Sequence, residues 1–348
     1  MEQVSEGRAR EWLPRTAGLL IGTLALAVAF IAAYVGALHD PTPRDLPVGF
    51  VLGDQRAEAV LAAVRGQSHV VEPIEYDDAA AADDGLHDRE VYGVLASDPQ
   101  GGLLLTVASA SGPSATTAIA QVFTTAAQRA NTPLRVTDRV PVASTDPRGV
   151  VPFYLNVGYV LGGYLASTVL GIAVGTTPRT LRRSALRIAA LTVYSVVLGV
   201  AGALVVGPGL GAFAHHLVAI AATGALTVLA AAMIASAIQG WLGILGTGLV
   251  ILLLVVVGNP GSGGIYAPEF LPDGLRGMHR WNVPGLANDL TKSAVYFHGR
   301  AALWPAVGLA VWAVVGAAGL LTATLVRGRR AAVPTRVRSG SGEASGTG

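Results

Sequence analysis

The sequence predicts an α-helical polytopic membrane protein that carries a small extracytoplasmic α/β domain between its first and second transmembrane helices. Three observations lead to this fold class. Hydrophobic residues make up 52% of the 348-residue chain and charged residues only 13%, against about 25% charged residues in an ordinary soluble protein. Residues 188–268 contain no Asp, Glu, Lys or Arg. The basic residues gather instead in three clusters beside apolar stretches.

The apolar stretches predict six transmembrane helices, because a helix needs about 20 apolar residues to cross the hydrocarbon core. The first stretch exceeds the roughly 7–15 apolar residues of a cleaved signal peptide, so we interpret it as an uncleaved anchor. Breakers at residues 207–211 and at Gln239-Gly240 divide the long uncharged run into three spans. The predicted spans are residues 17–38, 152–175, 188–207, 217–238, 241–258 and 303–326.

The basic clusters support an even number of spans, because Lys and Arg are enriched in cytoplasmic loops. Two predicted spans separate the first cluster from the second, and four separate the second from the third. We therefore expect a plasma-membrane protein whose residues 1–16 and disordered tail, residues 327–348, are both cytoplasmic. The clusters are Arg8, Arg10 and Arg15; Arg179, Arg182, Arg183 and Arg187; and Arg327, Arg329, Arg330, Arg336 and Arg338.

Residues 39–151 are expected outside the membrane, and their 15 acidic residues and eight arginines give them the opposite charge bias. Apolar patterning and turn residues indicate a compact α/β domain. Strands are predicted at residues 46–52, 70–76, 91–96, 103–108 and 134–142, and helices at 55–65, 77–88 and 114–129. Asp54 is the predicted N-cap of the first of these helices.

One acidic cluster in this domain has the ligand types of a divalent-cation site, but a solvated helix face explains it better. Its spacing lacks the glycine of a calcium loop. The cluster consists of Asp77, Asp78, Asp83, Asp84 and Asp88.

Residues 259–302 form a second external segment, rich in Gly, Pro and aromatic residues. Gly and Pro at this density predict turns, and aromatic residues are typical of a membrane interface. We expect a partly re-entrant or interface-lying cap that closes the bundle on its outer side, ending in a helix over residues 287–297. The candidate cap residues are Asn259, Pro260, Gly263, Gly264, Pro272, Pro284 and Phe297.

The inventory of reactive residues argues against an enzyme, and no cofactor or metal site is predicted. The chain has no cysteine, and its single lysine, Lys292, has no glycine-rich loop before it, which excludes a Walker A motif. His215 and His216 are adjacent and would point about 100° apart on a helix, so we interpret them as interfacial residues rather than zinc ligands. The six predicted spans contain no ionisable residue, which makes a proton-coupled antiporter a poor fit.

The order of these elements resembles the ABC-2-type transporter permeases, especially their YhgE/Pip-like branch. Residues 46–54 (LPVGFVLGD) are similar to the LPVAVVNxD start of that family, and residues 91–95 (VYGVL) resemble its second external signature. The stretch from Gly258 to Gly299 resembles the family's segment before the final span. The external domain is much shorter here than in typical members, which carry long helical insertions.

The resemblance implies a permease subunit that works with a separate cytoplasmic ABC ATPase, and a homodimer or heterodimer of permease subunits. The best candidate for the ATPase-contact loop lies in residues 176–187 and comprises Arg179, Arg182, Arg183 and Arg187, although the same charges also anchor the topology. The cargo would be hydrophobic or amphipathic, because the spans offer few polar groups. Two alternatives remain at this stage. One is a non-transporting scaffold or receptor whose external domain binds a cell-envelope component or a partner protein, and the other is a membrane-embedded enzyme.

A single lysine beside abundant Ala, Gly and Arg is typical of a bacterium with GC-rich DNA. The sequence predicts no nucleic-acid partner, because the arginines flank membrane spans.

Overall fold

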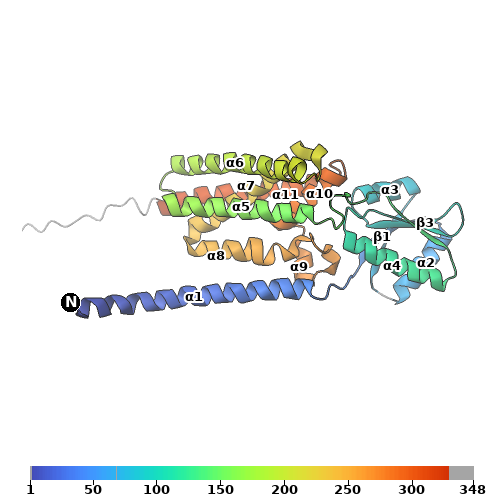
Figure 1. Ribbon diagram of the computed structural model, residues 1–348, viewed down its shortest axis with the longest axis horizontal. Helices are drawn as coiled ribbons and strands as arrows, with labels where there is room; N and C mark the ends of the chain where they lie inside the picture. The colour runs from blue at the N-terminus through green and yellow to red at the C-terminus, as the bar shows by residue number, and fades with distance from the viewer. Residues whose placement is uncertain (1, 68, 329–348) are drawn as a thin grey trace, which may run out of the picture.

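The computed structural model describes residues 2–67 and 69–328. The molecule is elongated, with a helical bundle at one end and an α/β domain at the other (Figure 1). Five described helices are long and apolar enough to cross a membrane: residues 16–38, 151–174, 181–209, 214–242 and 303–327. A multi-pass membrane protein with a small α/β domain after its first long helix is therefore confirmed as the architecture.

The α/β domain is a five-stranded sheet between two layers of helices. The strand order is β2-β1-β3-β4-β5. Neighbouring strands are parallel except β3 and β4, which form an antiparallel pair. The strands are β1 (Leu46–Val51), β2 (Val71–Tyr76), β3 (Gly93–Ser97), β4 (Leu103–Val107) and β5 (Leu134–Asp138). All five predicted strands are present, although β5 ends four residues earlier than expected.

Three helices cover the two faces of this sheet: α2 (Gln55–Gln67), α3 (Ala79–His87) and α4 (Pro113–Arg129). Alternate residues of β1, such as Val48 and Phe50, pack with α2 and α4 in the main core of the domain. Leu86 of α3 packs against Val94 on the opposite face. The predicted N-cap is confirmed, since the Asp54 carboxylate accepts a hydrogen bond of 3.1 Å from the Ala57 N–H.

The bundle is built around α7 (Leu217–Leu242), whose side chains are the most buried of the long helices. Its neighbours are α5 (Val151–Val174), α6 (Leu181–Leu204, continued by a π-helical turn to Gly209) and α11 (Leu303–Ala323). A methyl group at Gly163 would lie 2.6 Å from the Val228 carbonyl oxygen, and one at Gly199 2.5 Å from that of Ala221. Glycine at these contacts lets the backbones approach, which supplies packing where lipid removes the hydrophobic driving force.

The first helix, α1 (Glu2–Leu38), lies beside the bundle rather than within it (Figure 1). Large apolar side chains of its outer half, such as Leu24, Ile31 and Val35, are more than half exposed. Only its outer end contacts the short helical segments that follow α8. This helix therefore presents an apolar surface that is suited to lipid.

The predicted turn at Gln239-Gly240 is wrong. Helix α7 continues to Leu242, and the chain reverses at Gly243, whose φ of +66° favours glycine. Gln239 is buried within α7 because its amide nitrogen donates to the Thr168 and Thr247 hydroxyls and its carbonyl oxygen accepts from Ser167. With these hydrogen bonds, the Gln239 amide can be buried within a helix, so its polarity does not indicate a turn.

The fifth predicted span is shorter than expected. It consists of α8 (Leu245–Ile251) and a π-helical stretch, Leu252–Val257. At about 1.5 Å per residue this helix covers about 20 Å, against about 30 Å of hydrocarbon. It nevertheless runs back along the bundle toward the α/β domain (Figure 1). The described residues thus contain five long apolar helices and one short apolar helix, rather than six spans of full length.

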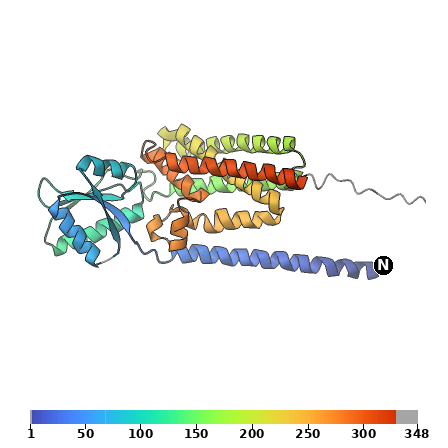
Figure 2. The same cartoon turned by 180° about the vertical axis from the view of Figure 1, so that it is seen from behind.

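The third predicted span also begins earlier than expected, at Leu181 instead of residue 188. Arg182, Arg183 and Arg187 therefore lie on the first two turns of α6 and not in a loop. The N-terminal end of α1, the α5–α6 connection and the C-terminal end of α11 all lie at the end of the bundle remote from the α/β domain (Figures 1 and 2). The predicted tail, residues 327–348, falls almost entirely outside the described residues.

A cap of short helices joins the bundle to the α/β domain. It contains two 3₁₀ turns (Pro260–Ser262 and Pro268–Phe270), α9 (Asp273–Met278) and α10 (Val283–Tyr296). Helix α10 packs against α5, α7 and α11 at the outer end of the bundle. Phe297, directly after α10, is 1% exposed and packs with Leu86 and Val91 of the α/β domain. These short helices thus lie at one end of the bundle and hold the α/β domain, while the side of the membrane on which they lie stays a prediction.

We expect Phe297→Ala to loosen the external domain, because removing a buried phenylalanine costs about 3–5 kcal/mol. Hydrogen exchange in peptides covering residues 86–91 should accelerate, while exchange in α7 should stay slow. Phe30→Ala on the exposed face of α1 is the matched control, and it should leave these peptides unchanged. Equal exchange in the two variants would contradict this role for Phe297.

Candidate functional site

A cavity of about 820 Å³ lies where the α/β domain meets the cap. Ligand sites in proteins commonly measure about 300–1,000 Å³. The α/β domain contributes Asp88, Arg89, Glu90, Tyr92 and Ser111. The cap and the start of α11 contribute Gly263, Pro268, Glu269, Arg276, Gly277, His279, Arg280, Trp281, Asp289, Lys292, Ala301, Trp304 and Pro305.

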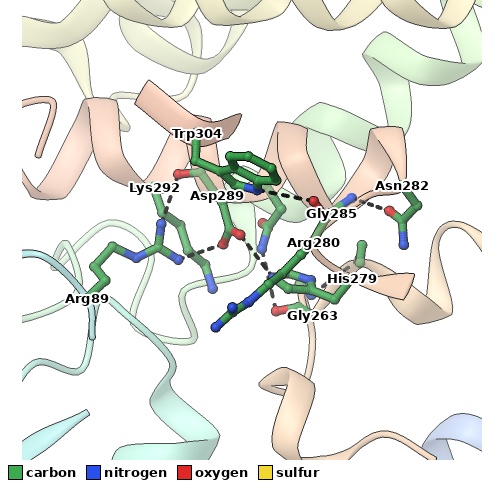
Figure 3. Close-up of polar contacts among 12 residues, drawn as sticks. Arg89, Gly263, His279, Arg280, Asn282, Gly285, Asp289, Lys292 and Trp304 are labelled. Atoms are coloured by element: carbon green, nitrogen blue, oxygen red, sulfur yellow. Dashed lines mark hydrogen bonds and ion pairs between the residues drawn. The ribbon is translucent and has the colours of Figure 1, made fainter. Parts of the chain in front are cut away.

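Asp289 of α10 lies between the side chains of Arg89 and His279 (Figure 3). Its Oδ1 accepts a 2.7 Å hydrogen bond from Arg89 Nη2, and its Oδ2 lies 2.9 Å from His279 Nε2. Arg89 Nη1 also donates to the Asp289 carbonyl oxygen at 3.0 Å and to Ser293 Oγ at 3.1 Å. Burial alone would raise the pKa of Asp289, but the charges of His279 and Arg89 outweigh it and hold that pKa well below its ordinary value.

The backbone of Arg89 is in an unfavourable conformation. Its φ of +60° falls in the left-handed region that non-glycine residues seldom adopt. Its side chain reaches α10 from the loop that follows α3, where it also lies 5.8 Å from the centre of the Phe297 ring. The charge-assisted bonds to Asp289 offset the strain.

Lys292 is one turn further along α10, and its side chain is 4% exposed. Its Nζ donates one hydrogen bond, of 3.0 Å, to the Ser111 carbonyl oxygen in the α/β domain. An ammonium group has three donors. Burial lowers the pKa of Lys292 to about 8, the Arg89 charge adds to this effect, and the carboxylates of Asp289, Glu269 and Asp146 oppose it.

A second polar link joins the α/β domain to the cap on another side of the cavity. The Tyr92 hydroxyl donates to Glu269 Oε2 at 2.8 Å. Burial and the negative charge of Glu269 together raise the pKa of Tyr92 well above its ordinary value, so the phenol keeps its proton.

Several buried polar atoms of the cavity residues have no hydrogen-bond partner within the described residues. They are Arg89 Nε, Ser111 Oγ and His279 Nδ1. The guanidinium of Arg280 also has no ion-pair partner among those residues, and Figure 3 shows its end pointing to the same side of Asp289 as the end of Lys292. Arg89 Nε and the Arg280 guanidinium are thus donors without a protein acceptor among the described residues.

Two exposed tryptophans form one wall of the cavity. The Trp281 and Trp304 rings meet edge to face, with centroids 5.2 Å apart, and their side chains are 62% and 51% exposed. Trp312, two turns further into the membrane-spanning helix α11, donates to the Trp281 carbonyl oxygen at 2.7 Å. Trp281 is thus tied to a long apolar helix, and exposed tryptophans at the end of such a helix are typical of a membrane interface.

Exposed ion pairs surround the cavity and again connect the domain to the cap. Arg300 bonds to Asp84 and Asp88 at 2.9 and 2.8 Å, and Arg276 bonds to Asp45 at 3.2 Å. These contacts account for part of the acidic cluster, since Asp78 caps α3 and Asp83 lies beside Arg139 and His87. Asp84 and Asp88 thus share Arg300, while Asp78 and Asp83 have other partners, and the described residues hold no group of three acids arranged for a cation.

The predicted cap residues have mainly structural positions. Only Gly263 lines the cavity. Asn259 and Pro260 begin the first 3₁₀ turn, Pro272 precedes α9 and Pro284 lies in the first turn of α10. Gly264 packs against the Phe153 ring of α5. The structure thus places Phe297 and these residues where they seat the cap, and it brings one of the seven into the cavity.

The predicted ATPase-contact residues lie at the opposite end of the bundle. Arg179, Arg182 and Arg183 are exposed. Arg187 is buried, 5% exposed, and donates to the carbonyl oxygens of Gly175, Thr176 and Ser167 at 3.0–3.1 Å. The prediction that the spans contain no ionisable residue is therefore wrong, because α6 begins before Arg187 and carries it into the bundle.

Sequence reasoning missed nearly all of the cavity residues. Lys292 stood out as the chain's single lysine, but only as a reason to exclude a Walker A loop. The available signal was the pair Asp289 and Lys292, two charged residues three positions apart on one predicted helix. His215 and His216 lie in a short 3₁₀ turn before α7, as their interfacial interpretation requires. Among the described residues no group of three or more His, Asp or Glu side chains is arranged to hold a metal ion.

Comparison of the chain with protein-family models, with curated proteins and with solved structures gives no significant match.

We expect Lys292 to titrate near pH 8, well below the ordinary lysine pKa of about 10.4. Because the folded chain then binds this proton less tightly than the unfolded chain, the free energy of unfolding should rise as the pH increases from about 8 to about 10. Reductive methylation with ¹³C-formaldehyde labels the single lysine, and NMR can follow its chemical shift against pH. Lys292→Arg identifies the signal by removing it. A midpoint near pH 10 would contradict the burial of this amine.

Proposed function

We propose that this chain is the membrane permease subunit of an ABC-2-type exporter, which moves a hydrophobic or amphipathic substrate across the plasma membrane with a separate ATPase. The observation that carries the proposal is the Arg187 contact. By holding the Gly175, Thr176 and Ser167 carbonyl oxygens, Arg187 fixes the α5–α6 connection to both helices. A force applied to the exposed arginines at this connection would pass directly into the bundle.

Helix α5 extends that mechanical path to the outer cap. At its outer end, Asn156 Nδ2 donates to the Ala287 carbonyl oxygen and to Thr291 Oγ1 of α10, both at 3.1 Å. Helix α10 in turn carries Asp289 and Lys292, which bind the α/β domain. A motor acting at one end of the bundle would thus be coupled through packed and hydrogen-bonded elements to the cavity at the other end.

The proposed topology has six crossings, with the α8 segment as the short fifth. The α5–α6 connection, the start of α1 and the end of α11 share one end of the bundle (Figure 2), and their arginines favour the cytoplasm for that end. Arg327, whose guanidinium lies 5.8 Å from the centre of the Trp241 ring, belongs to this end as well. The acidic α/β domain would then be extracytoplasmic.

The proposed assembly contains two permease subunits and the ATPase. Support for a second subunit comes from α1, whose apolar side chains are exposed in the single chain. The proposed substrate class follows from the bundle surface, which is apolar, and from the mixed polar and aromatic cavity at its outer end. In this proposal the chain itself performs no chemical reaction, and the ATPase supplies the energy.

One observation favours the alternative of a non-transporting receptor. Strand β5 lies at the edge of the sheet, and four of its five residues are exposed, among them Val136. An open edge can pair with an extended segment of a partner. If Val136→Pro abolishes partner binding while no ATPase associates with the chain, this alternative gains.

We expect Arg182→Gln combined with Arg183→Gln to weaken ATPase association about tenfold, because a tenfold change corresponds to about 1.4 kcal/mol, within reach of two lost charge contacts. The measurement is recovery of the ATPase with the tagged chain in mild detergent, quantified by mass spectrometry.

Arg148→Gln, an exposed arginine on the α/β domain, is the matched control and should keep full association. Reporter tags must give the same topology in both variants. Full ATPase recovery with the double variant would exclude Arg182 and Arg183 from the proposed interface. Absence of any ATPase with the unaltered chain would contradict the exporter itself.

A further inference from the structure

We infer that the cavity between the α/β domain and the cap binds the anionic headgroup of an amphipathic molecule, whose apolar part lies along Trp281 and Trp304. This inference names the substrate class of the proposed exporter and rests on that proposal for its role in transport, but the binding itself can be measured separately.

The balance of donors and acceptors sets the sign of the ligand charge. Four carboxylates line the cavity, and each already has a protein partner. Asp289 binds Arg89 and His279, and Glu269 accepts from Tyr92. Asp88 binds Arg300, and Glu90 accepts from Tyr76. On the donor side, Lys292 has used one of three N–H groups and Arg280 has used none within the described residues. What the cavity lacks is an acceptor that carries negative charge.

Because Lys292 is buried, water cannot easily satisfy the two N–H groups that the protein leaves without an acceptor. An ammonium that is 4% exposed and bonded to one carbonyl oxygen loses hydration that it does not recover from the protein. Asp289, Glu269 and Asp146 lie near enough to act on its pKa, yet none of them lies within hydrogen-bond distance of Nζ. A phosphate or carboxylate group in the cavity would supply the missing contacts.

The wall of the cavity indicates that the anion is attached to an apolar chain. Trp281 and Trp304 border the cavity and are more than half exposed. Leu303, the first residue of α11, is 79% exposed beside them. The hydrogen bond from Trp312 ties Trp281 to a membrane-spanning helix. A headgroup in the cavity could therefore keep its acyl chain in lipid, with the indoles at the boundary.

The position of the cavity also connects ligand binding to the two domains. Arg89 approaches from the α/β domain, and Lys292 and Arg280 approach from the cap (Figure 3). Ser111 of the α/β domain also lines the cavity. A headgroup that takes bonds from both sides would hold the domain onto the bundle more firmly than the protein contacts alone. Binding should thus slow hydrogen exchange at the junction.

The test uses the full chain in detergent and a short-chain probe, dihexanoyl phosphatidic acid, with binding measured by calorimetry. Dihexanoyl phosphatidylcholine tests the need for net negative charge, and inorganic phosphate tests the need for the apolar part. Lys292→Met removes the ammonium with similar volume, and Arg280→Gln removes the unpaired guanidinium. Arg148→Gln is the distant control.

We expect phosphatidic acid to bind the unaltered chain at least tenfold more tightly than the other two probes. Lys292→Met should weaken its binding at least tenfold and Arg280→Gln about fivefold, while Arg148→Gln leaves it unchanged. Lys292→Arg, which keeps the charge, should retain most of the affinity and guards against a loss due to misfolding.

Unchanged phosphatidic acid binding in Lys292→Met would overturn the proposed site. Equal binding of phosphatidylcholine would overturn the requirement for an anion, and equal binding of inorganic phosphate would overturn the amphipathic ligand in favour of a free anion. If the site binds as expected but the chain recruits no ATPase, the exporter fails and the site stands. If an ATPase is recruited and phosphatidic acid does not bind, the site fails and the exporter stands.

Discussion

The ion cluster around Asp289 is the interaction on which the arrangement of the two domains depends. A carboxylate placed between protein domains is costly unless all its acceptor sites are used. Asp289 meets this condition only when Arg89 arrives from the α/β domain and His279 from the cap. Two further features agree with this requirement. Arg89 adopts a left-handed backbone conformation that lets its side chain reach Asp289, and Phe297 packs against the α/β domain beside it.

The membrane part obeys a different constraint, since lipid is as apolar as the side chains. Glycines of α5 and α6 lie directly against the backbone of the central helix, α7, so these helices pack closely. Several buried polar side chains there bond to one another or to backbone carbonyl oxygens, while Arg187 Nε has no partner among the described residues. The amide of Gln239, the hydroxyls of Ser167 and Ser236 and the guanidinium of Arg187 all find partners within the bundle. Such pairing makes polar residues tolerable in a low-dielectric interior and gives the bundle a defined register.

Elements whose signals are local in the sequence were predicted correctly, and features that depend on contacts between distant residues were not. Strands such as residues 46–51 and the helix after Asp54 were predictable, because alternation and capping are local properties. Gln239 was misassigned, since its amide is satisfied by Thr168 and Thr247 and neither contact is visible in the local sequence. Arg187 was misassigned for the same reason. The cavity was beyond prediction, because Arg89, Glu269 and Lys292 come from three segments that only the folded chain brings together.

The central claim is that Asp289 fixes the α/β domain to the bundle as one body. The absence of cysteine from the sequence allows a clean pair of spin labels, at exposed Gln121 in α4 and exposed Val311 in α11. Double electron–electron resonance should give one narrow distance distribution for the otherwise unaltered chain and a broad one after Asp289→Ala. A broad distribution in both, or a narrow one in both, would contradict the claim.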